Sequence, residues 1–370
     1  MTIKRVDSPE YHSVFNSETG FFARWGKTYD DDPEMSVLGP ELMDIEISTV
    51  CNGFGKSMET RKPCSWCYKS NTEIGDNMSI ETFTHIASMF PPTVNQIAFG
   101  IGDIDSCPDL WKIMEYCRAR GIVPNLTTNG MGIEGEVAQR LANTMGAVAV
   151  SHYGDDLCFN AVKALTDAGL KQVNIHKLIS QETLASCFNI IDKAATDTRL
   201  SKLKAIVFLL LKPKGDRNQL TPVKEMASYQ KLMNYARERG VSVGMDSCSA
   251  PMALQTLPEE CVASIEPCES SLFSMYVSVK GEVFPCSFTE GLPGWESGIP
   301  MTEINDFKDI WYHPRLTVWR EALLNSSKGC TSCGHSKHCR SCPIYDISIC
   351  NPKPELNRSS MKLVTIGNMR

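Results

Sequence analysis

The chain lacks the features of a membrane or secreted protein. Among its 370 residues the longest uninterrupted apolar run covers residues 205–211, seven residues, far short of the ~20 that span a bilayer. The N-terminal segment MTIKRVDSPEYHSVFNSETG has no apolar core of the kind a signal peptide requires. We therefore expect no membrane partner and a cytoplasmic protein whose thiols stay reduced.

An excess of positive charge is also absent. The net charge is −6 and the pI is near 5.7, so the field of the whole protein does not attract nucleic acid, and we expect no nucleic-acid partner. The sequence has no internal repeat and no low-complexity linker. A length of 370 residues suits one barrel-sized domain and a smaller one.

Cysteine, in contrast, is abundant. Of the 16 cysteines, three lie near the start of the chain, at Cys51, Cys64 and Cys67. Seven more lie in the last third of the chain: Cys268, Cys286, Cys330, Cys333, Cys339, Cys342 and Cys350. Because a reducing compartment disfavours disulfides, these two groups point to metal or iron–sulfur sites.

Strand-like and helix-like segments alternate from residue 44 to residue 240. The expected strands are short and rich in Val, Ile and Leu, as strands buried on both faces are; they cover residues 44–50, 96–101, 122–127, 146–151, 172–179 and 203–211. Expected helices begin at Pro108 and at Thr221-Pro222, and two more cover residues 158–165 and 184–191. Six βα units predict an α/β fold with a parallel sheet, either a partial (β/α)6 TIM-like barrel or an open doubly wound sheet.

The composition divides the chain into four parts. Residues 1–42 are polar and are expected to form an N-terminal extension on the surface. Residues 43–240 form the partial barrel. Residues 241–350 are expected to be a small, loop-rich domain stabilised by metal, and residues 351–370 a C-terminal tail.

The first cysteine group suits a cluster with an open coordination position. Cys51 follows the first expected strand, at the rim where βα barrels place their chemistry, and Cys64-Ser65-Trp66-Cys67 follows twelve residues later. Three thiolates on a cube of four irons leave one iron without a protein ligand. A structural zinc site with a distant fourth ligand is the alternative.

This arrangement resembles the radical S-adenosylmethionine (SAM) enzymes. Their motif is Cys-x3-Cys-x2-Cys with an aromatic residue before the last cysteine, and this chain keeps Cys64-x2-Cys67 with Trp66 in the aromatic position. It departs from the motif in the twelve residues that follow Cys51. The resemblance implies that Cys51, Cys64 and Cys67 hold the radical-generating [4Fe–4S] cluster and that Trp66 lies against the adenine of SAM.

Further landmarks of that family fall at the ends of the next expected strands. The resemblance implies that Gly102 and Asp103 occupy the turn that receives the SAM amino group. It places Asn129 and Ser151 against the ribose or the carboxylate. The alternative is that these four are ordinary turn residues between strand and helix.

The second cysteine group resembles the SPASM domain, an extension that binds auxiliary [4Fe–4S] clusters. The pattern includes Gly281 between the first two of its seven cysteines. The resemblance implies an outer cluster on Cys330, Cys333, Cys339 and Cys350. It implies an inner cluster on Cys268, Cys286 and Cys342, with Cys248 or Cys261 as candidates for a fourth ligand unless that iron is open to substrate. A zinc ribbon on Cys330, Cys333, Cys339 and Cys342 is the alternative.

Four cysteines remain outside these groups. Cys117, Cys158 and Cys187 fall on apolar helix faces and are expected to fill the core. Cys107 has no assigned role.

The resemblance implies an oxidoreductase or maturase that cleaves SAM reductively to a 5′-deoxyadenosyl radical and modifies a peptide or protein side chain by cross-linking or oxidation. The partners it implies are a peptide substrate, a flavodoxin- or ferredoxin-like electron donor and, because residues 1–42 are too few for a leader-binding domain, a separate leader-binding protein. A radical dehydrogenase or epimerase of a small sugar or amino acid is one alternative. A non-catalytic iron–sulfur or zinc protein is another. Asp103, Asp246, Glu290 and His176 are the candidates for proton transfer, with none preferred.

Overall fold

The fold is built on one ten-stranded sheet, seen in a computed structural model that describes residues 3–262, 264–327, 330, 333–336 and 339–345. The strand order is β10-β9-β8-β7-β6-β5-β4-β11-β12-β13. The strands are β4 (Leu42–Glu46), β5 (Gln96–Gly100), β6 (Val123–Thr128), β7 (Ala147–Ser151), β8 (Val173–Ile179), β9 (Ala205–Leu210), β10 (Val243–Met245), β11 (Ser274–Val277), β12 (Glu282–Phe284) and β13 (Ile299–Pro300).

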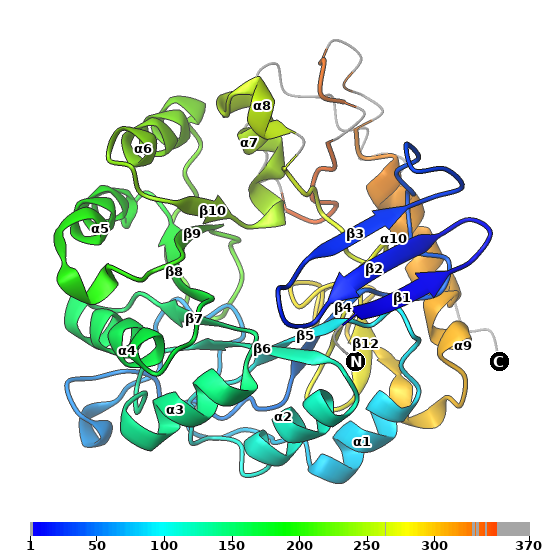
Figure 1. The fold of residues 1–370 in the computed structure, drawn as a ribbon, viewed down its shortest axis with the longest axis horizontal. Coiled ribbons are helices and arrows are strands. Elements are labelled where there is room, and N and C mark those ends of the chain that lie inside the picture. The colour runs from blue at the N-terminus through cyan, green and yellow to red at the C-terminus, as the bar shows by residue number, and fades with distance from the viewer. Residues whose placement is uncertain (1–2, 263, 328–329, 331–332, 337–338, 346–370) are drawn as a thin grey trace.

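Strands β4 to β10 are parallel and form the curved inner wall of an open barrel, and the helices lie outside it (Figure 1). The outer helices are α1 (Ile80–Ser88), α2 (Leu110–Ala119), α3 (Gly135–Thr144), α4 (Asp155–Asp167), α5 (Leu184–Thr196) and α6 (Met226–Glu238). All six expected strands are present, and the partial TIM-like barrel is confirmed over the open doubly wound sheet.

Strand β4 shows how the sequence sorts its side chains between the two faces of this wall. Successive residues of a strand point to opposite faces. Met43 and Ile45 are fully buried in the hydrophobic core, whereas Asp44 and Glu46 line a cavity inside the barrel, which Leu42 and Ile45 also border. The two acids of this strand therefore lie at the cavity.

Two expected boundaries are wrong. The strand expected over 44–50 ends at Glu46, because the following residues leave the sheet to bond a neighbouring loop, with the Cys51 amide donating to the Thr72 carbonyl at 2.7 Å. The helix expected from Thr221-Pro222 begins only at Met226. The Thr221 amide instead donates to the Glu182 carboxylate at 3.0 Å, and the buried Val223 packs in the core as part of an extended connection.

The N-terminal segment is more ordered than a surface extension. It forms a three-stranded antiparallel sheet of β1 (Ile3–Asp7), β2 (His12–Asn16) and β3 (Phe22–Trp25), which lies in front of β4 and β12 in Figure 1. Tyr11 is fully buried and its hydroxyl donates to the Glu41 carboxylate at 2.5 Å. Arg24 ties the same segment to Glu41 at 2.9 Å and to Glu269 at 2.8 Å.

The C-terminal region continues the barrel sheet. Strand β11 pairs in parallel with β4, and β12 and β13 follow as antiparallel neighbours. The helices of this region are α7 (Ala250–Thr256), α8 (Glu259–Val262), α9 (Phe307–Trp311) and α10 (Pro314–Leu324). Cys350 and the expected tail, residues 351–370, lie outside the described residues. Within the described ranges, no helix is both long and apolar enough to cross a membrane.

Candidate functional site

The two cysteine groups border one cavity of about 870 Å³ inside the barrel. Its lining includes Cys51, Cys64 and Cys67 of the first group and Cys268, Cys286 and Cys342 of the second. Cys51 lies beyond the carboxyl end of β4. Cys268 precedes β11 and Cys286 follows its antiparallel partner β12, so both lie toward the amino end of β4. The cavity therefore runs along β4, whose five residues span roughly 15 Å, with one cysteine group toward each end.

The three thiols of the first group converge on the cavity. The Cys64 and Cys67 thiols hydrogen-bond to each other, and this contact lowers the pKa of Cys67 to about 6 and raises the pKa of Cys64. Burial raises the pKa of Cys51 to about 11, and the nearby Asp103 and Cys67 add to this rise. Three thiols in mutual electrostatic contact at one cavity wall are a donor set that fits an iron–sulfur cluster.

The loop that carries this group is held by residues that the sequence did not single out. Arg217 donates to the carbonyls of Asn71 at 2.8 Å and Cys64 at 3.4 Å. Gly215 has a positive φ of 102°, and a Cβ there would lie 2.2 Å from the Cys67 carbonyl oxygen. The segment after β9 therefore packs directly on the cysteine loop, and only glycine permits that approach.

An aromatic wall stands beside the first group. Phe54 stacks on Tyr153 with 4.5 Å between ring centroids, and Trp66 lies 6.0 Å from Tyr153. All three rings line the cavity. Trp66 was expected here from its place in the motif, whereas Phe54 lies in the twelve-residue segment between Cys51 and Cys64, and Tyr153 follows β7.

The residues expected at the strand ends divide into two kinds. Gly102, Asn129 and Ser151 line the cavity. Asp103 lies behind its wall with 0% of its surface exposed; its carboxylate accepts hydrogen bonds from the Asn52 amide at 2.5 Å and the Asn129 side chain at 2.6 Å. The Asp103 side chain therefore positions these neighbours, while Gly102, beside it in the same turn, lines the cavity.

Gly102 has a steric reason to be glycine that the sequence did not reveal. A Cβ at this position would lie 2.0 Å from the Val50 carbonyl oxygen and 2.6 Å from the Cys51 Cβ. No side chain fits between the two loops, so Gly102 sets how closely the turn after β5 approaches Cys51.

The second cysteine group splits between the cavity and the surface beside it. Burial raises the pKa of Cys286 to about 12, and the thiols of Cys268 and Cys342 raise it further. Cys330, Cys333 and Cys339 are half-buried and do not line the cavity. The Cys333 amide donates to the Cys330 carbonyl at 3.2 Å, which brings the backbones of these two cysteines together.

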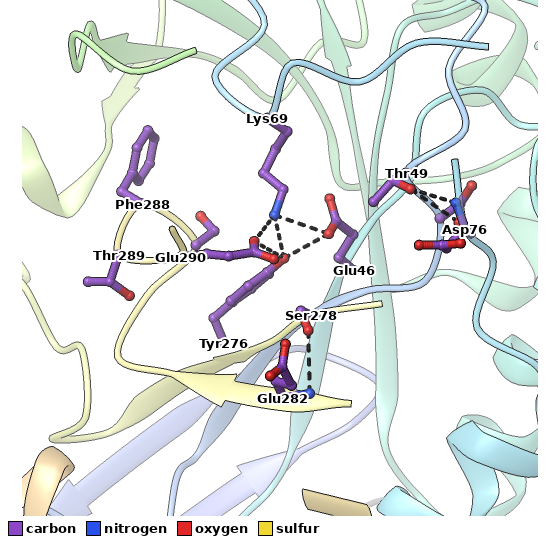
Figure 2. A network of polar contacts seen from close by, with 12 residues as sticks. Glu46, Thr49, Lys69, Asp76, Tyr276, Ser278, Glu282, Phe288, Thr289 and Glu290 are labelled. Atoms are coloured by element: carbon purple, nitrogen blue, oxygen red, sulfur yellow. Dashed lines mark hydrogen bonds and ion pairs between the residues drawn. The ribbon is translucent and has the colours of Figure 1, made fainter. Parts of the chain in front are cut away.

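A buried polar network joins the two cysteine-bearing loops across the cavity (Figure 2). Lys69, two residues after Cys67, donates to the Tyr276 hydroxyl at 2.7 Å and lies 3.1 Å from the Glu46 carboxylate. It also forms an ion pair with Glu290, four residues after Cys286. The Tyr276 hydroxyl in turn donates to Glu46 at 2.9 Å. The Lys69 and Glu46 side chains are only 9% and 6% exposed, so each charge depends on its partners.

The four candidates for proton transfer occupy different settings. Glu290 belongs to this network, and Asp103 lies behind the wall. His176 lines the cavity, and burial lowers its pKa to about 4, so the ring is neutral. Asp246 accepts from the ammonium of Lys212 and from the Ser249 hydroxyl at 2.5 Å.

Asp44 is a further acid at the cavity, and sequence reasoning missed it. It lines the cavity beside Glu46, and burial raises its pKa to about 6. No hydrogen bond or ion pair of its carboxylate is found among the described residues. A carboxylate that is half-buried without a counter-ion costs stability and is a mark of functional sites.

Replacing Asp44 with asparagine is therefore expected to stabilise the protein at high pH. Above about pH 6 the folded chain must bury the Asp44 charge, whereas at about pH 3 the group is largely neutral in both folded and unfolded states. The free energy of unfolding should rise by about 1–3 kcal/mol at pH ~8 and by about half of that at pH ~5. Denaturant titration at both pH values measures this, with the exposed Asp30→Asn as control; equal effects of the two variants would contradict it.

No group of three or more His, Cys, Asp or Glu in the described part of the chain is arranged to hold a metal ion. A four-iron cluster is larger than one ion, so its thiolates are spaced farther apart than zinc ligands. None of the fifteen cysteines within the described ranges is in a disulfide.

The chain is similar in sequence to an iron–sulfur domain family and to a curated maturase. Residues 268–343 match the SPASM family, an iron–sulfur cluster-binding domain. The mycofactocin maturase MftC of Mycobacterium tuberculosis is 25% identical over 264 residues, which are 66% of this chain and 64% of that protein. The chain thus spans slightly under two thirds of the length of this curated relative.

Solved structures share the fold at low identity. SuiB of Streptococcus suis bound to S-adenosylmethionine superposes with a TM-score of 0.67 at 13% identity, over 92% of this chain and 94% of SuiB. SuiB bound to the precursor peptide SuiA gives 0.66 at 14% identity, over 91% and 95%. The native anSMEcpe with bound AdoMet gives 0.55 at 18% identity, over 80% and 88%. The resemblance to radical SAM enzymes is confirmed: the chain has their barrel fold and carries a C-terminal SPASM iron–sulfur cluster-binding domain.

Proposed function

We propose that this protein is a radical SAM oxidoreductase that modifies a side chain of a peptide or protein. The observation that carries the proposal is the single cavity that has three thiols of each cysteine group in its lining. Cys51, Cys64 and Cys67 would hold a [4Fe–4S] cluster that, once reduced, would supply the electron for cleavage of SAM to methionine and a 5′-deoxyadenosyl radical, and this radical would take a hydrogen atom from the substrate. The other parts of the proposal concern the residues of this chain.

The first part assigns the SAM end of the cavity. Cys51, Cys64 and Cys67 would hold the cluster, with Asp103 and Arg217 fixing their loops through Asn52, Asn71 and the Cys64 carbonyl. Trp66, with Phe54 and Tyr153, offers apolar faces on which an adenine ring can stack. Gly102, Asn129 and Ser151 would contact the polar parts of SAM. The barrel wall around these residues excludes water from a reactive radical.

The second part assigns the opposite end. Cys268, Cys286 and Cys342 would hold the inner auxiliary cluster, and Cys330, Cys333, Cys339 and Cys350 the outer one. Between the two ends lie Asp44, Glu46 and the Lys69 network, which would contact the substrate and exchange protons with it. Asp44 is the residue we favour for proton transfer, because its carboxylate faces the cavity and its pKa of about 6 lies near neutral pH.

The proposed substrate is a peptide. The relatives support it: MftC is named as a maturase, and SuiB has been solved with its precursor peptide. A cavity of about 870 Å³ lies in the upper part of the range for small-molecule sites, so SAM and one substrate side chain can share it. A flavodoxin- or ferredoxin-like donor and a separate leader-binding protein are proposed as partners in the cytoplasm.

The test is turnover of SAM with and without peptide. We expect dithionite-reduced, anaerobically reconstituted protein to convert SAM to 5′-deoxyadenosine, measured by liquid chromatography. A short peptide encoded beside this chain's gene should accelerate this conversion and change mass. Acceleration by free sugars or amino acids, with no change in the peptide, would favour a small-molecule dehydrogenase or epimerase instead.

A further inference from the structure

The auxiliary cluster at the inner end of the cavity has three expected cysteine ligands, which leaves its fourth iron unassigned. We infer that Cys248 is the fourth protein ligand of this cluster, beside Cys268, Cys286 and Cys342. The inference rests on the proposed cluster binding by the SPASM domain. It selects one of the two candidates, Cys248 and Cys261, that remained open from the sequence.

The first argument is the position of the two candidates. Cys248 lies in the 3₁₀ helix η3 (Ser247–Ser249), directly after β10, and lines the same cavity as Cys268, Cys286 and Cys342. Cys261 lies in α8 and lines a different cavity, of about 730 Å³, bordered by α6 and by residues 256–258. Of the two candidates, Cys248 therefore shares a cavity with the other three thiols and Cys261 does not.

The second argument is proximity among the thiols. The thiols of Cys268 and Cys342 lie close enough to the Cys248 thiol to interact with it electrostatically. The same two thiols interact with the Cys286 thiol, and all four cysteines line the cavity. Cys248 and Cys286 thus share two cysteine neighbours, and the four sulfurs form one group at the cavity wall.

The third argument is charge. The ammonium of Lys212 ion-pairs with Asp246 and also hydrogen-bonds to the Cys248 sulfur. Lys212 is buried, and a buried cation beside a thiol stabilises the thiolate that binds iron.

The core cysteines provide the contrast. Cys117, Cys158 and Cys187 are also buried, yet they lie on helices in the hydrophobic core and do not line this cavity. Packing in the core accounts for these three cysteines, as the sequence predicts. It does not account for Cys248, which lines the cavity. If Cys248 completes the ligand set, the inner cluster has no open iron for the substrate, which must then be bound by side chains such as Asp44 and Glu46.

The test uses protein in which Cys51, Cys64 and Cys67 are replaced by alanine, so that the iron belongs to the auxiliary clusters. On this background we compare Cys248→Ala, Cys248→Ser and Cys261→Ala after anaerobic reconstitution. The readouts are iron per chain and the electron paramagnetic resonance spectrum, taken after reduction and after mild ferricyanide oxidation. An iron without a protein thiolate is released on such oxidation and leaves a three-iron cluster with its own signal.

We expect Cys248→Ala either to give this three-iron signal or to lose about half of the auxiliary iron, since each of two clusters holds about four irons. Cys248→Ser should keep the cluster with a shifted reduced spectrum, because its oxygen replaces sulfur, which separates ligation from misfolding. Cys261→Ala should match the parent. Parent-like behaviour of both Cys248 variants, or a change caused by Cys261→Ala, overturns the inference. A parent without any iron–sulfur signal would instead defeat the proposed cluster binding itself.

Discussion

Replacing Cys51, Cys64 and Cys67 together with alanine is expected to abolish formation of 5′-deoxyadenosine and to remove about four irons per chain. These three thiols converge on the cavity beside the aromatic wall of Phe54 and Tyr153. Without them no cluster forms at the end of the cavity where SAM is proposed to bind. Liquid chromatography of the SAM reaction and iron analysis of the same samples measure the two losses.

A matched triple variant tests whether the removal of any three buried cysteines would have the same effect. Cys117, Cys158 and Cys187 are buried in the core and border no part of the cavity. Their joint replacement by alanine should lower the unfolding temperature while leaving the iron content unchanged. If the core variant loses the activity, or if the Cys51 variant retains it, the active cluster lies elsewhere.

The second large effect is expected from Lys69→Met, which removes the cation of the network in Figure 2. Glu46 and Glu290 would then face each other and Tyr276 without a positive charge. Breaking a buried ion pair by removal of one partner costs roughly 3–5 kcal/mol, because the remaining charge stays buried and unpaired. Denaturant titration of the reconstituted protein should show a loss of that size.

Lys112→Met is the control for this prediction. Lys112 pairs with Asp109 at 2.7 Å, but its side chain is 67% exposed, so its loss should cost less than about 1 kcal/mol. Adding Glu46→Gln and Glu290→Gln to Lys69→Met should recover most of the stability, since no unpaired charge then remains. Similar losses for Lys69→Met and Lys112→Met would show that the network is not the buried link described above.

Local patterns explain what the sequence could predict. The six barrel strands that the sequence predicted, β4 to β9, are rich in the Val, Ile and Leu that buried parallel strands carry. Cys64 and Cys67 are separated by one turn, and that spacing is visible in the sequence. The cavity lining of Gly102, Asn129 and Ser151 followed from their places after successive strands, because parallel strands bring their carboxyl ends to one rim.

Contacts between residues far apart in the chain explain which features could not be predicted from the sequence. Lys69 and Glu290 are 221 residues apart, and the sequence around neither residue indicates that the two side chains form an ion pair. Arg217 likewise reaches the Asn71 carbonyl across 146 residues. The capping pair Thr221-Pro222 predicted a helix start, but Glu182 takes the Thr221 amide. The three-stranded N-terminal sheet was missed because only a few of its side chains, Val6, Tyr11 and Phe15 among them, are buried apolar residues in a segment with many polar ones.

Asp44 is a site residue that could not be identified from the sequence. The sequence places it at the start of an expected strand, between the apolar residues Met43 and Ile45, and no neighbouring motif marks it as a site residue. The structure turns it into the barrel beside Glu46. Its unfavourable burial is visible only once the opposite wall, with Tyr276 and the second cysteine group, is in place.

Metal and sulfide analysis of the anaerobically reconstituted protein tests the central claim most directly. The claim is that the two cysteine groups hold one SAM-cleaving cluster and two auxiliary clusters. It predicts about twelve irons per chain with an equal amount of sulfide, at about four of each per cluster. Stoichiometric zinc, with neither iron nor sulfide retained, would contradict it.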